Sequence, residues 1–310
     1  MPEVMPFVIL AGSDQRPGPV PKQLQVGDML SGFKGAIPLP WGRSLAAELV
    51  ARVRATGRFR DPLLVGPRAV YAGLVDCEII DVAGTLAATL QRVIEVVRTR
   101  FDGHAPMAVS ACDILPTPSE ITNLLTSEFD LHADCCFWWQ WITAETETLG
   151  ASAWKPRYAI RRGPDAPPET VYPGHLTIFR PQTVRLELLM RLLTLAYRYR
   201  NWPPRQRVWP MFSRGLGMML EEDLRNLGRG QLPILTVSIP WHLLRAFREL
   251  QTRRLTVPGL ERHAARVLLH RRFRRRGRPV VISVSPILSF AQDIDTQAEL
   301  DAISAQGAGG

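Results

Sequence analysis

The chain has 310 residues, of which 46% are hydrophobic, so it can bury a sizeable core, and disorder along its whole length is excluded. Its length suits one large domain, or one domain with an insertion. The net charge of +9 favours anionic partners. Four cysteines without a CxxC pair and six histidines without an HxxxH pair argue against zinc and redox sites.

Targeting signals are missing from the sequence pattern. No apolar run approaches the roughly 18 residues that a membrane-spanning helix needs. The first residues, MPEVMPFVILAG, lack the basic start and the small-residue cleavage site of a signal peptide. We therefore expect a cytoplasmic protein.

The first 125 residues alternate between short apolar runs and amphipathic segments. This pattern predicts strands over 4–10, 63–65, 77–82 and 107–112, and helices over 44–56 and 85–99. Such an order is typical of an α/β domain with a mainly parallel sheet. In such sheets ligands bind beyond the carboxyl ends of the strands, where Gly12, Gly66 and Asp113 are found.

The second half of the chain is mainly helical. We expect strands over 133–142, 171–179 and 280–284, and helices over 183–200, 215–227, 240–252 and 258–275. Thr296 and Glu299 fit a capping box, which predicts a closing helix up to about residue 303. The expected organisation is an α/β core (1–182), a helical, arginine-rich insertion (183–278), and a last core strand with a closing helix and a disordered tail (279–310).

Four segments in order carry the strongest chemical signal. They are Leu10-Ala11-Gly12-Ser13, with Arg16 nearby; Lys34-Gly35-Ala36-Ile37-Pro38-Leu39, followed by Gly42-Arg43-Ser44-Leu45; Ala111-Cys112-Asp113-Ile114-Leu115-Pro116; and Asp293-Ile294-Asp295-Thr296. Together they resemble the MobA-like class of nucleotidyltransferases, which includes the sugar-phosphate and molybdopterin members. The resemblance covers residues 4–125 and returns at 290–300.

The resemblance has implications for fold and activity. It implies a Rossmann-like, mixed but mainly parallel sheet of the nucleotide-diphospho-sugar transferase type. It implies transfer of a nucleoside monophosphate from an NTP to a phosphorylated acceptor, with release of pyrophosphate. The cofactor would be Mg²⁺, and the acceptor a phosphorylated small molecule or a lipid-linked phosphate.

The same resemblance assigns roles to single residues. The backbone of Leu10, Ala11, Gly12 and Ser13 would cradle the nucleotide phosphates, because glycine lets a ligand approach the chain closely. Lys34 would neutralise charge at the α-phosphate, with Lys22 as a rival for that role, and Arg16 would contact the leaving pyrophosphate. Each also has an ordinary structural interpretation, as a strand-end turn or a solvated charge.

Acidic residues are the expected metal ligands. Asp113 and Asp295 would hold Mg²⁺, which prefers one or two carboxylates together with substrate phosphates, and Asp293 is a third candidate. As plain structural elements, the same residues would be turn or helix-capping aspartates. Gly84 and Thr85 open a helix after a strand and would line the base, while Gly174 and His175 resemble the acceptor-side segment of the family.

Two other functions remain as alternatives. Asp293-Ile294-Asp295 is formally a DxD motif, as in glycosyltransferases that use nucleotide-sugars. An inactive relative could instead bind anions or an anionic membrane surface through the basic stretch Arg271-Arg272-Phe273-Arg274-Arg275-Arg276-Gly277-Arg278, at the end of the expected helix 258–275. The sequence shows no aromatic-interleaved motif of the kind that supports nucleic-acid binding, which argues against nucleic acid as a partner.

Overall fold

A computed structural model describes residues 4–12, 30, 32–82, 86–144, 157–199, 202–275 and 277–307. Within these residues, strands form one eight-stranded sheet in the order β3-β2-β1-β4-β7-β5-β8, and β6 pairs with β7 outside this path. The strands are β1 (Phe7–Leu10), β2 (Leu63–Gly66), β3 (Glu78–Asp81), β4 (Met107–Ala111), β5 (Phe137–Thr143), β6 (Tyr158–Arg161), β7 (Pro168–Phe179) and β8 (Val280–Ser285).

The sheet is mixed, because one strand runs against its neighbours. β1 pairs in parallel with β2 and β4, β2 with β3, and β5 with β8. β7 is antiparallel to β4, β5 and β6. Leu10 is in register with both Val65 and Ala111, so β1, β2 and β4 end side by side at one edge of the sheet.

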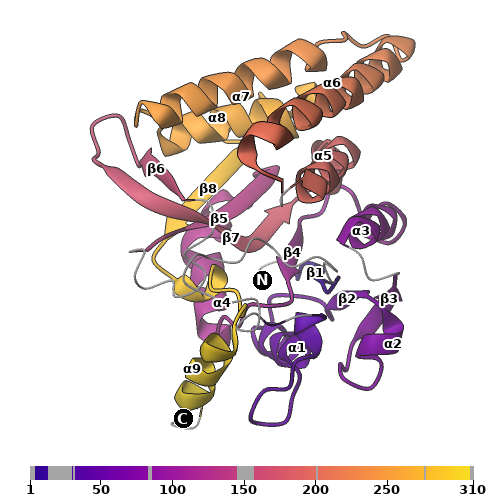
Figure 1. Cartoon of the computed structure of the whole chain (residues 1–310), viewed down its shortest axis with the longest axis vertical. Helices are drawn as coiled ribbons and strands as arrows, with labels where there is room; N and C mark the ends of the chain where they lie inside the picture. Colours follow the sequence, from indigo (N-terminus) through magenta and orange to yellow (C-terminus); the bar gives the residue numbers. More distant parts are fainter. Residues whose placement is uncertain are drawn as a thin grey trace.

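Helices cover both faces of the sheet (Figure 1). In the core they are α1 (Leu45–Ala55), α2 (Arg68–Tyr71), α3 (Leu86–Arg100), α4 (Pro118–Leu124) and α9 (Gln297–Gly307). Between β7 and β8 the chain forms α5 (Leu186–Tyr199), α6 (Pro204–Gly228), α7 (Leu235–Gln251) and α8 (Val257–Leu268). Figure 1 places α6 and α7 at the opposite end of the molecule from α9.

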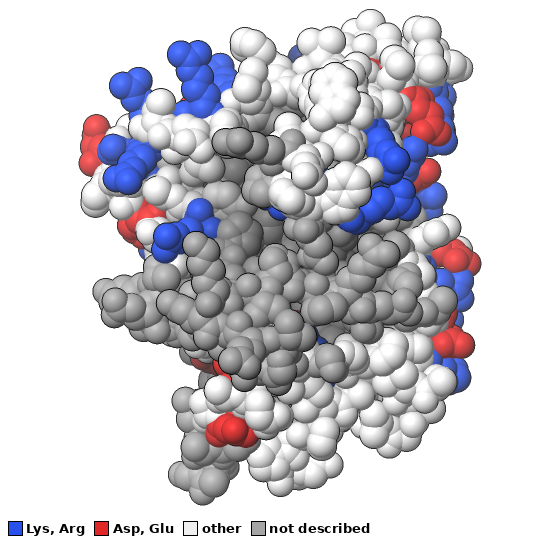
Figure 2. All heavy atoms as spheres, viewed as in Figure 1, with Lys and Arg blue, Asp and Glu red and all other residues white. Residues whose placement is uncertain are grey.

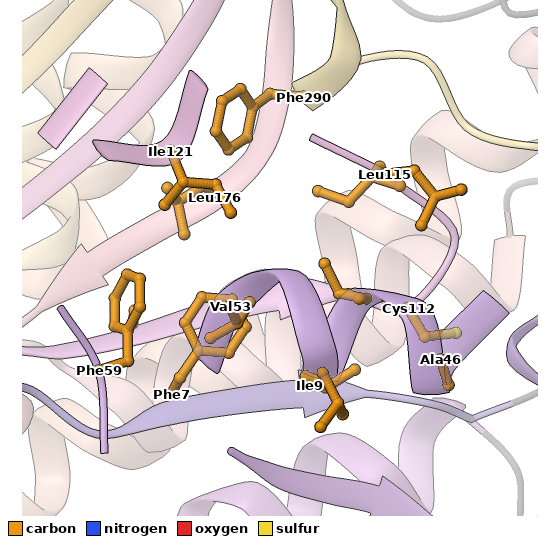
Figure 3. Close-up of a cluster of buried hydrophobic side chains, with 14 of the residues drawn as sticks. Phe7, Ile9, Ala46, Val53, Phe59, Cys112, Leu115, Ile121, Leu176 and Phe290 are labelled. Carbon is orange, nitrogen blue, oxygen red and sulfur yellow. The ribbon is translucent and has the colours of Figure 1, made fainter. Parts of the chain in front are cut away.

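Burial on both faces explains why β1 is apolar throughout. Phe7 and Ile9 belong to a core that includes α1, and Figure 3 shows them near Val53 of that helix. Val8 points to the other face and packs with side chains of α3. A strand covered on both sides is expected to be continuously hydrophobic, and each such side chain stabilises the fold by about 1.5–3 kcal/mol.

Several local predictions are confirmed. Ser44 caps α1, since its hydroxyl accepts from the amide of Ala47 at 3.3 Å. The capping box before α9 is also present: the Glu299 amide donates to the Thr296 hydroxyl, and the Glu299 carboxylate accepts from the Thr296 amide at 3.0 Å. α9 continues to Gly307, beyond the predicted end at residue 303, and residues 308–310 lie outside the described chain.

Other predicted boundaries are wrong. The helix expected over 258–275 ends at Leu268, because Leu269 is extended and forms a bridge with Val184. The strand expected over 133–142 begins only at Phe137, and β6 was not expected. Lys34–Ala36 form a 3₁₀ turn, and an isolated bridge between Pro38 and Ser44 follows it.

Two helices of the insertion begin earlier than their sequence pattern indicates. α6 starts at Pro204 and contains Pro210, whereas the prediction started it at 215. α7 starts at Leu235 and contains Pro240, at which the prediction had started the helix. The Asp223 carboxylate accepts from the amides of Leu235 and Thr236 at 2.8 and 2.7 Å, so a tertiary contact caps α7 where no local residue does.

A buried carboxylate joins the insertion to the sheet. Glu261 of α8 is 7% exposed and accepts from the Ile282 amide of β8 at 2.8 Å. Its two oxygens also accept from the Arg278 guanidinium, with Nε at 2.9 Å. Arg278 therefore orients this junction instead of standing free at the surface.

We predict that Glu261→Ala lowers the free energy of unfolding by about 3 kcal/mol, because it leaves a buried amide and a guanidinium without their acceptor. Urea denaturation followed by circular dichroism measures the change. Glu95→Ala removes a carboxylate from an exposed pair with Arg92 and should cost at most about 0.5 kcal/mol. Equal losses in the two variants would contradict the structural role of Glu261.

Candidate functional site

Four charged residues from distant parts of the chain meet beyond the carboxyl end of β4. Asp113 follows that strand by two residues, and Lys34 begins a 3₁₀ turn. Asp293 and Asp295 lie in the connection between β8 and α9. One carboxylate oxygen from each aspartate lies within 4.8 Å of the others, so the three could share one cation.

Backbone hydrogen bonds hold these segments together. The amide of Ile294 donates to the Asp113 carbonyl at 3.0 Å, which fixes the acidic loop against the end of β4. The Asp295 amide donates to the Glu299 carboxylate at 2.9 Å, and the Asp295 carbonyl accepts from the amide of Leu30 at 2.8 Å. The positions of the acidic groups are thus set by the main chain as well as by their charges.

Lys34 lies between two of the carboxylates. Its Nζ is 3.5 Å from Asp113 Oδ2 and also forms an ion pair with Asp295 Oδ1. Burial acts to lower the pKa of Lys34, but the neighbouring Asp113 and Asp295 carboxylates outweigh it and raise the pKa above its usual value. The ammonium therefore stays charged throughout the physiological range.

The acidic groups are crowded. Burial, together with the negative charge of Asp293, raises the pKa of Asp113, although Lys34 acts in the opposite direction. His175 Nε2 is 2.5 Å from Asp293 Oδ1. The Asp295 side chain is 3% exposed, and its Oδ2 has no hydrogen-bond partner among the described residues.

This donor set fits a hard divalent cation. Three carboxylates face one ammonium and one imidazole, so negative charge is in excess, and one buried oxygen lacks a donor. Magnesium is bound by carboxylate oxygens together with substrate phosphates, and it needs neither thiolate nor several imidazoles. The structure thus brings together the three aspartates that the sequence offered as candidate metal ligands, and their oxygens have the donor chemistry that Mg²⁺ prefers.

Gly35 allows the Lys34 turn to lie directly on the core. A Cβ at this position would come within 3.0 Å of the Tyr71 hydroxyl and 3.1 Å of Cys112 Sγ, so any larger residue would displace the turn. Burial raises the pKa of the Cys112 thiol to about 12, with a further contribution from Asp113. Cys112 therefore remains a protonated packing residue and is not a nucleophile.

The end of β1 lies next to this cluster. Leu10 of β1 is paired with Ala111 of β4, and these two strands are parallel neighbours. Gly12 and Asp113 each lie two residues after this pair, so they leave the sheet at the same edge. Ala11 is buried and donates its amide to the Val65 carbonyl at 2.9 Å. Leu10, Ala11 and Gly12 therefore lie where the sequence predicted, whereas Ser13, Arg16, Lys22, Gly84 and Thr85 are outside the described residues.

The predicted acceptor-side residues belong to β7. A Cβ at Gly174 would meet the Gln140 carbonyl at 2.9 Å, and the Gly174 carbonyl accepts from Trp139 Nε1 at 3.0 Å. The glycine therefore permits close contact with β5, beside a register shift between Trp139 and Trp141. The adjacent His175 reaches the acidic loop. The sequence did not predict the pairing of His175 with Asp293, because no local pattern relates β7 to that loop.

Comparisons with known proteins show the fold. No protein-family model matches the chain, and no curated protein matches it. A hypothetical transferase from Thermus thermophilus has a similar structure, with a TM-score of 0.54 and 18% identity over 96% of this chain and 100% of that one. CMP:2-keto-3-deoxy-manno-octonic acid synthetase, solved with CTP, gives a TM-score of 0.50 and 9% identity, over 99% and 98% of the two chains.

These likenesses and the strand order confirm the predicted fold class. The chain has the α/β fold of the nucleotide-diphospho-sugar transferase type, with a mixed sheet and a helical C-terminal half.

Proposed function

We propose that this chain is a magnesium-dependent nucleotidyltransferase of the MobA-like class, which moves a nucleoside monophosphate from an NTP to a phosphorylated acceptor. The observation that carries the proposal is the meeting of Lys34 with Asp113, Asp293 and Asp295 beside the end of β1. A strand-end glycine, one ammonium and a group of carboxylates are what a triphosphate and its metal require. The likeness to a CTP-bound synthetase supports the same conclusion.

In the proposed reaction an oxygen of the acceptor phosphate attacks the α-phosphorus of the NTP, and the bond to the β-phosphate oxygen breaks, so that pyrophosphate leaves. The acceptor phosphate is already ionised near pH 7, so no strong general base is needed. Catalysis then depends on positioning and on neutralising charge. This agrees with Cys112 being a protonated, buried thiol.

The site residues divide this work between them. Asp113, Asp295 and Asp293 would hold Mg²⁺, which when bound neutralises the triphosphate and the leaving pyrophosphate. Lys34 would stabilise the negative charge at the α-phosphoryl group, since its flexible side chain can exchange a carboxylate partner for a phosphate oxygen. The turn at Gly12, just beyond the sheet pairing of Leu10 and Ala11, would receive the phosphates, and His175 would face the acceptor.

A nucleotide-sugar-dependent glycosyltransferase is the second candidate function. The observation in its favour is that both acidic residues of Asp293-Ile294-Asp295 reach the cluster, as a DxD metal motif requires. The two reactions release different products, which separates them. Nucleotidyl transfer from an NTP releases pyrophosphate, whereas glycosyl transfer from a nucleotide-sugar releases a nucleotide.

We predict that Lys34→Gln reduces pyrophosphate release by about 10²–10³-fold, because it removes a charge that acts on the developing transition state. Lys22→Gln should reduce it less. The assay supplies each common NTP with Mg²⁺ and a panel of sugar phosphates, and a parallel assay supplies nucleotide-sugars. A larger loss for Lys22→Gln would assign the catalytic role to Lys22, and nucleotide release from nucleotide-sugars alone would favour the glycosyltransferase.

We predict that Asp113→Asn has opposite effects on stability without and with ligand. In EDTA at pH 7 the variant should be as stable as the wild type or more stable, because it removes one charge from a crowded, partly buried group of carboxylates. With an NTP and Mg²⁺ at about 100 times the dissociation constant, the wild type should gain about 2.7 kcal/mol and the variant almost nothing. Thermal unfolding measures both effects.

The sign of the pH dependence in EDTA provides a further check. Because the folded pKa of Asp113 is raised above its usual value of 3.8, the native chain binds this proton more tightly than the unfolded chain does. The wild type should therefore gain stability as the pH falls through the raised pKa, and Asp113→Asn should lose this gain. Asp61→Asn, at an exposed carboxylate, serves as the control. A pH profile unchanged by Asp113→Asn would contradict the described cluster.

A further inference from the structure

The outer surface of α6 and α7 is unusually apolar. Trp209 of α6 is 71% exposed, and Val237 and Trp241 of α7 are 74% and 59% exposed. Further exposed apolar side chains of these helices and their connection are Val208, Phe212, Leu220, Leu224, Leu227, Leu232, Leu243, Leu244 and Phe247. On α6, most of these exposed apolar residues are three or four residues apart, or twice that spacing. Residues at this spacing lie on the same side of a helix, so they form one stripe along α6. We call this surface the α6–α7 face.

The α6–α7 face is not needed to hold the two helices in place. Their inner sides pack through Met219, Leu235 and Ile239 against Leu188 of α5. α7 also packs along α8. Helices α6 and α7 are thus already anchored to the molecule, and the apolar side chains on their outer side take no part in this packing. Monomeric proteins seldom expose patches of this extent unless another surface covers them.

Arginines predominate on the first part of α6 and on most of α7, and the acidic residues Glu221, Glu222 and Asp223 follow on α6. Residues 204–220 contain three arginines and residues 235–248 contain two, and neither stretch contains an aspartate or a glutamate. In Figure 2 the upper part of the molecule, where Figure 1 places α6–α8, shows white surface with groups of blue atoms on both sides and smaller groups of red atoms at its edges. Apolar side chains next to arginines complement an anionic lipid bilayer, whose interior is apolar and whose head groups are negatively charged.

A hollow at one end of α7 fits this complementarity. It has a volume of about 440 Å³, and Trp241 and Leu244 line it together with Arg245, Arg248 and Arg254. The acidic residue of its lining, Glu249, is already engaged by Arg245 at 3.0 Å and by His263 at 3.3 Å. The hollow therefore combines an apolar wall with several guanidinium groups, which suits a phosphate head group with its acyl chain alongside.

Two other coverings are less suitable for the α6–α7 face. A second copy of the chain packed on the hollow would bring Arg248 and Arg254 against the same arginines of its partner, and the Glu249 carboxylate there is already paired with Arg245 and His263. A bilayer crossing is a different arrangement, and among the described residues no helix is long and apolar enough for it. The face is suited to lying on a bilayer.

The basic stretch that the sequence indicated as a membrane contact lacks the apolar side that this role needs. Leu260, Ala264 and Leu268 of α8 pack against the core of the sheet. Arg278 is paired with Glu261, and Arg274 donates to the carbonyls of Leu269 and Arg266. The apolar and basic features coincide on α6 and α7 instead.

We propose that the α6–α7 face binds an anionic lipid bilayer from one side, with Trp209 and Trp241 at the level of the head groups and the arginines on lipid phosphates. The inference does not rest on the proposed transferase activity. It assigns the helical insertion the task of holding the chain at a membrane surface.

The test is sedimentation of the full-length chain with lipid vesicles, without nucleotide or metal. Vesicles containing phosphatidylglycerol should carry down the wild type, and phosphatidylcholine vesicles much less of it. Leu244→Asp should lower the partition coefficient more than about tenfold, and Arg248→Ala about fivefold. Leu74→Asp makes the same change at an exposed site after α2, at the other end of the molecule in Figure 1, and should bind as the wild type does.

Thermal unfolding and light scattering complete the experiment. Each variant should melt within a few degrees of the wild type, so that loss of binding is not loss of folding; Trp241→Ser provides a second variant if Leu244→Asp fails to fold. Equal binding of wild type and Leu244→Asp would overturn the proposal. So would a lipid-independent dimer that Leu244→Asp dissociates, because the face would then be an interface between copies. Failure of nucleotidyl transfer would leave the vesicle result unaffected.

Discussion

The ion pairs of Lys34 with Asp113 and Asp295 are the interaction on which the site depends. Buried carboxylates so close together repel one another, and a single ammonium does not neutralise three of them. The fold accepts this unfavourable arrangement because backbone hydrogen bonds, such as that from Ile294 to Asp113, fix the acidic loop independently of its charges. An energetic disadvantage that a cation would remove is typical of a functional centre.

Strand pairing is what makes the charges converge. Because β1 and β4 are parallel and in register, their carboxyl ends bring Gly12 and Asp113 to the same edge of the sheet. β8 is parallel to β5, and the connection that follows it brings Asp293 and Asp295 back to that edge. β7 runs antiparallel between the two halves and adds His175 beside Asp293. Each half of the sheet thus supplies part of the same cluster of charged side chains.

The helical insertion lies away from this chemistry. Figure 1 shows α6 and α7 at one end of the molecule and α9, which follows the acidic loop, at the other. Glu261 and Arg278 attach α8 of the insertion to β8 through buried hydrogen bonds. The apolar side of α6 and α7 faces outward. Under the two proposals, this separation would let one part of the chain hold a membrane surface while another binds small charged ligands.

The sequence by itself determined the features that depend on near neighbours. The α/β order, the caps at Ser44 and at Thr296 with Glu299, and the strand-end positions of Gly12 and Asp113 follow from local periodicity and capping chemistry. Only the tertiary structure decided the rest. The end of α8 at Leu268 depends on a bridge to Val184, the start of α7 on Asp223, and the pairing of His175 with Asp293 on the strand order. Such contacts join residues far apart in the chain, and whether an apolar stripe like that of α6 faces the core or the outside depends on what else packs there, which periodicity does not record.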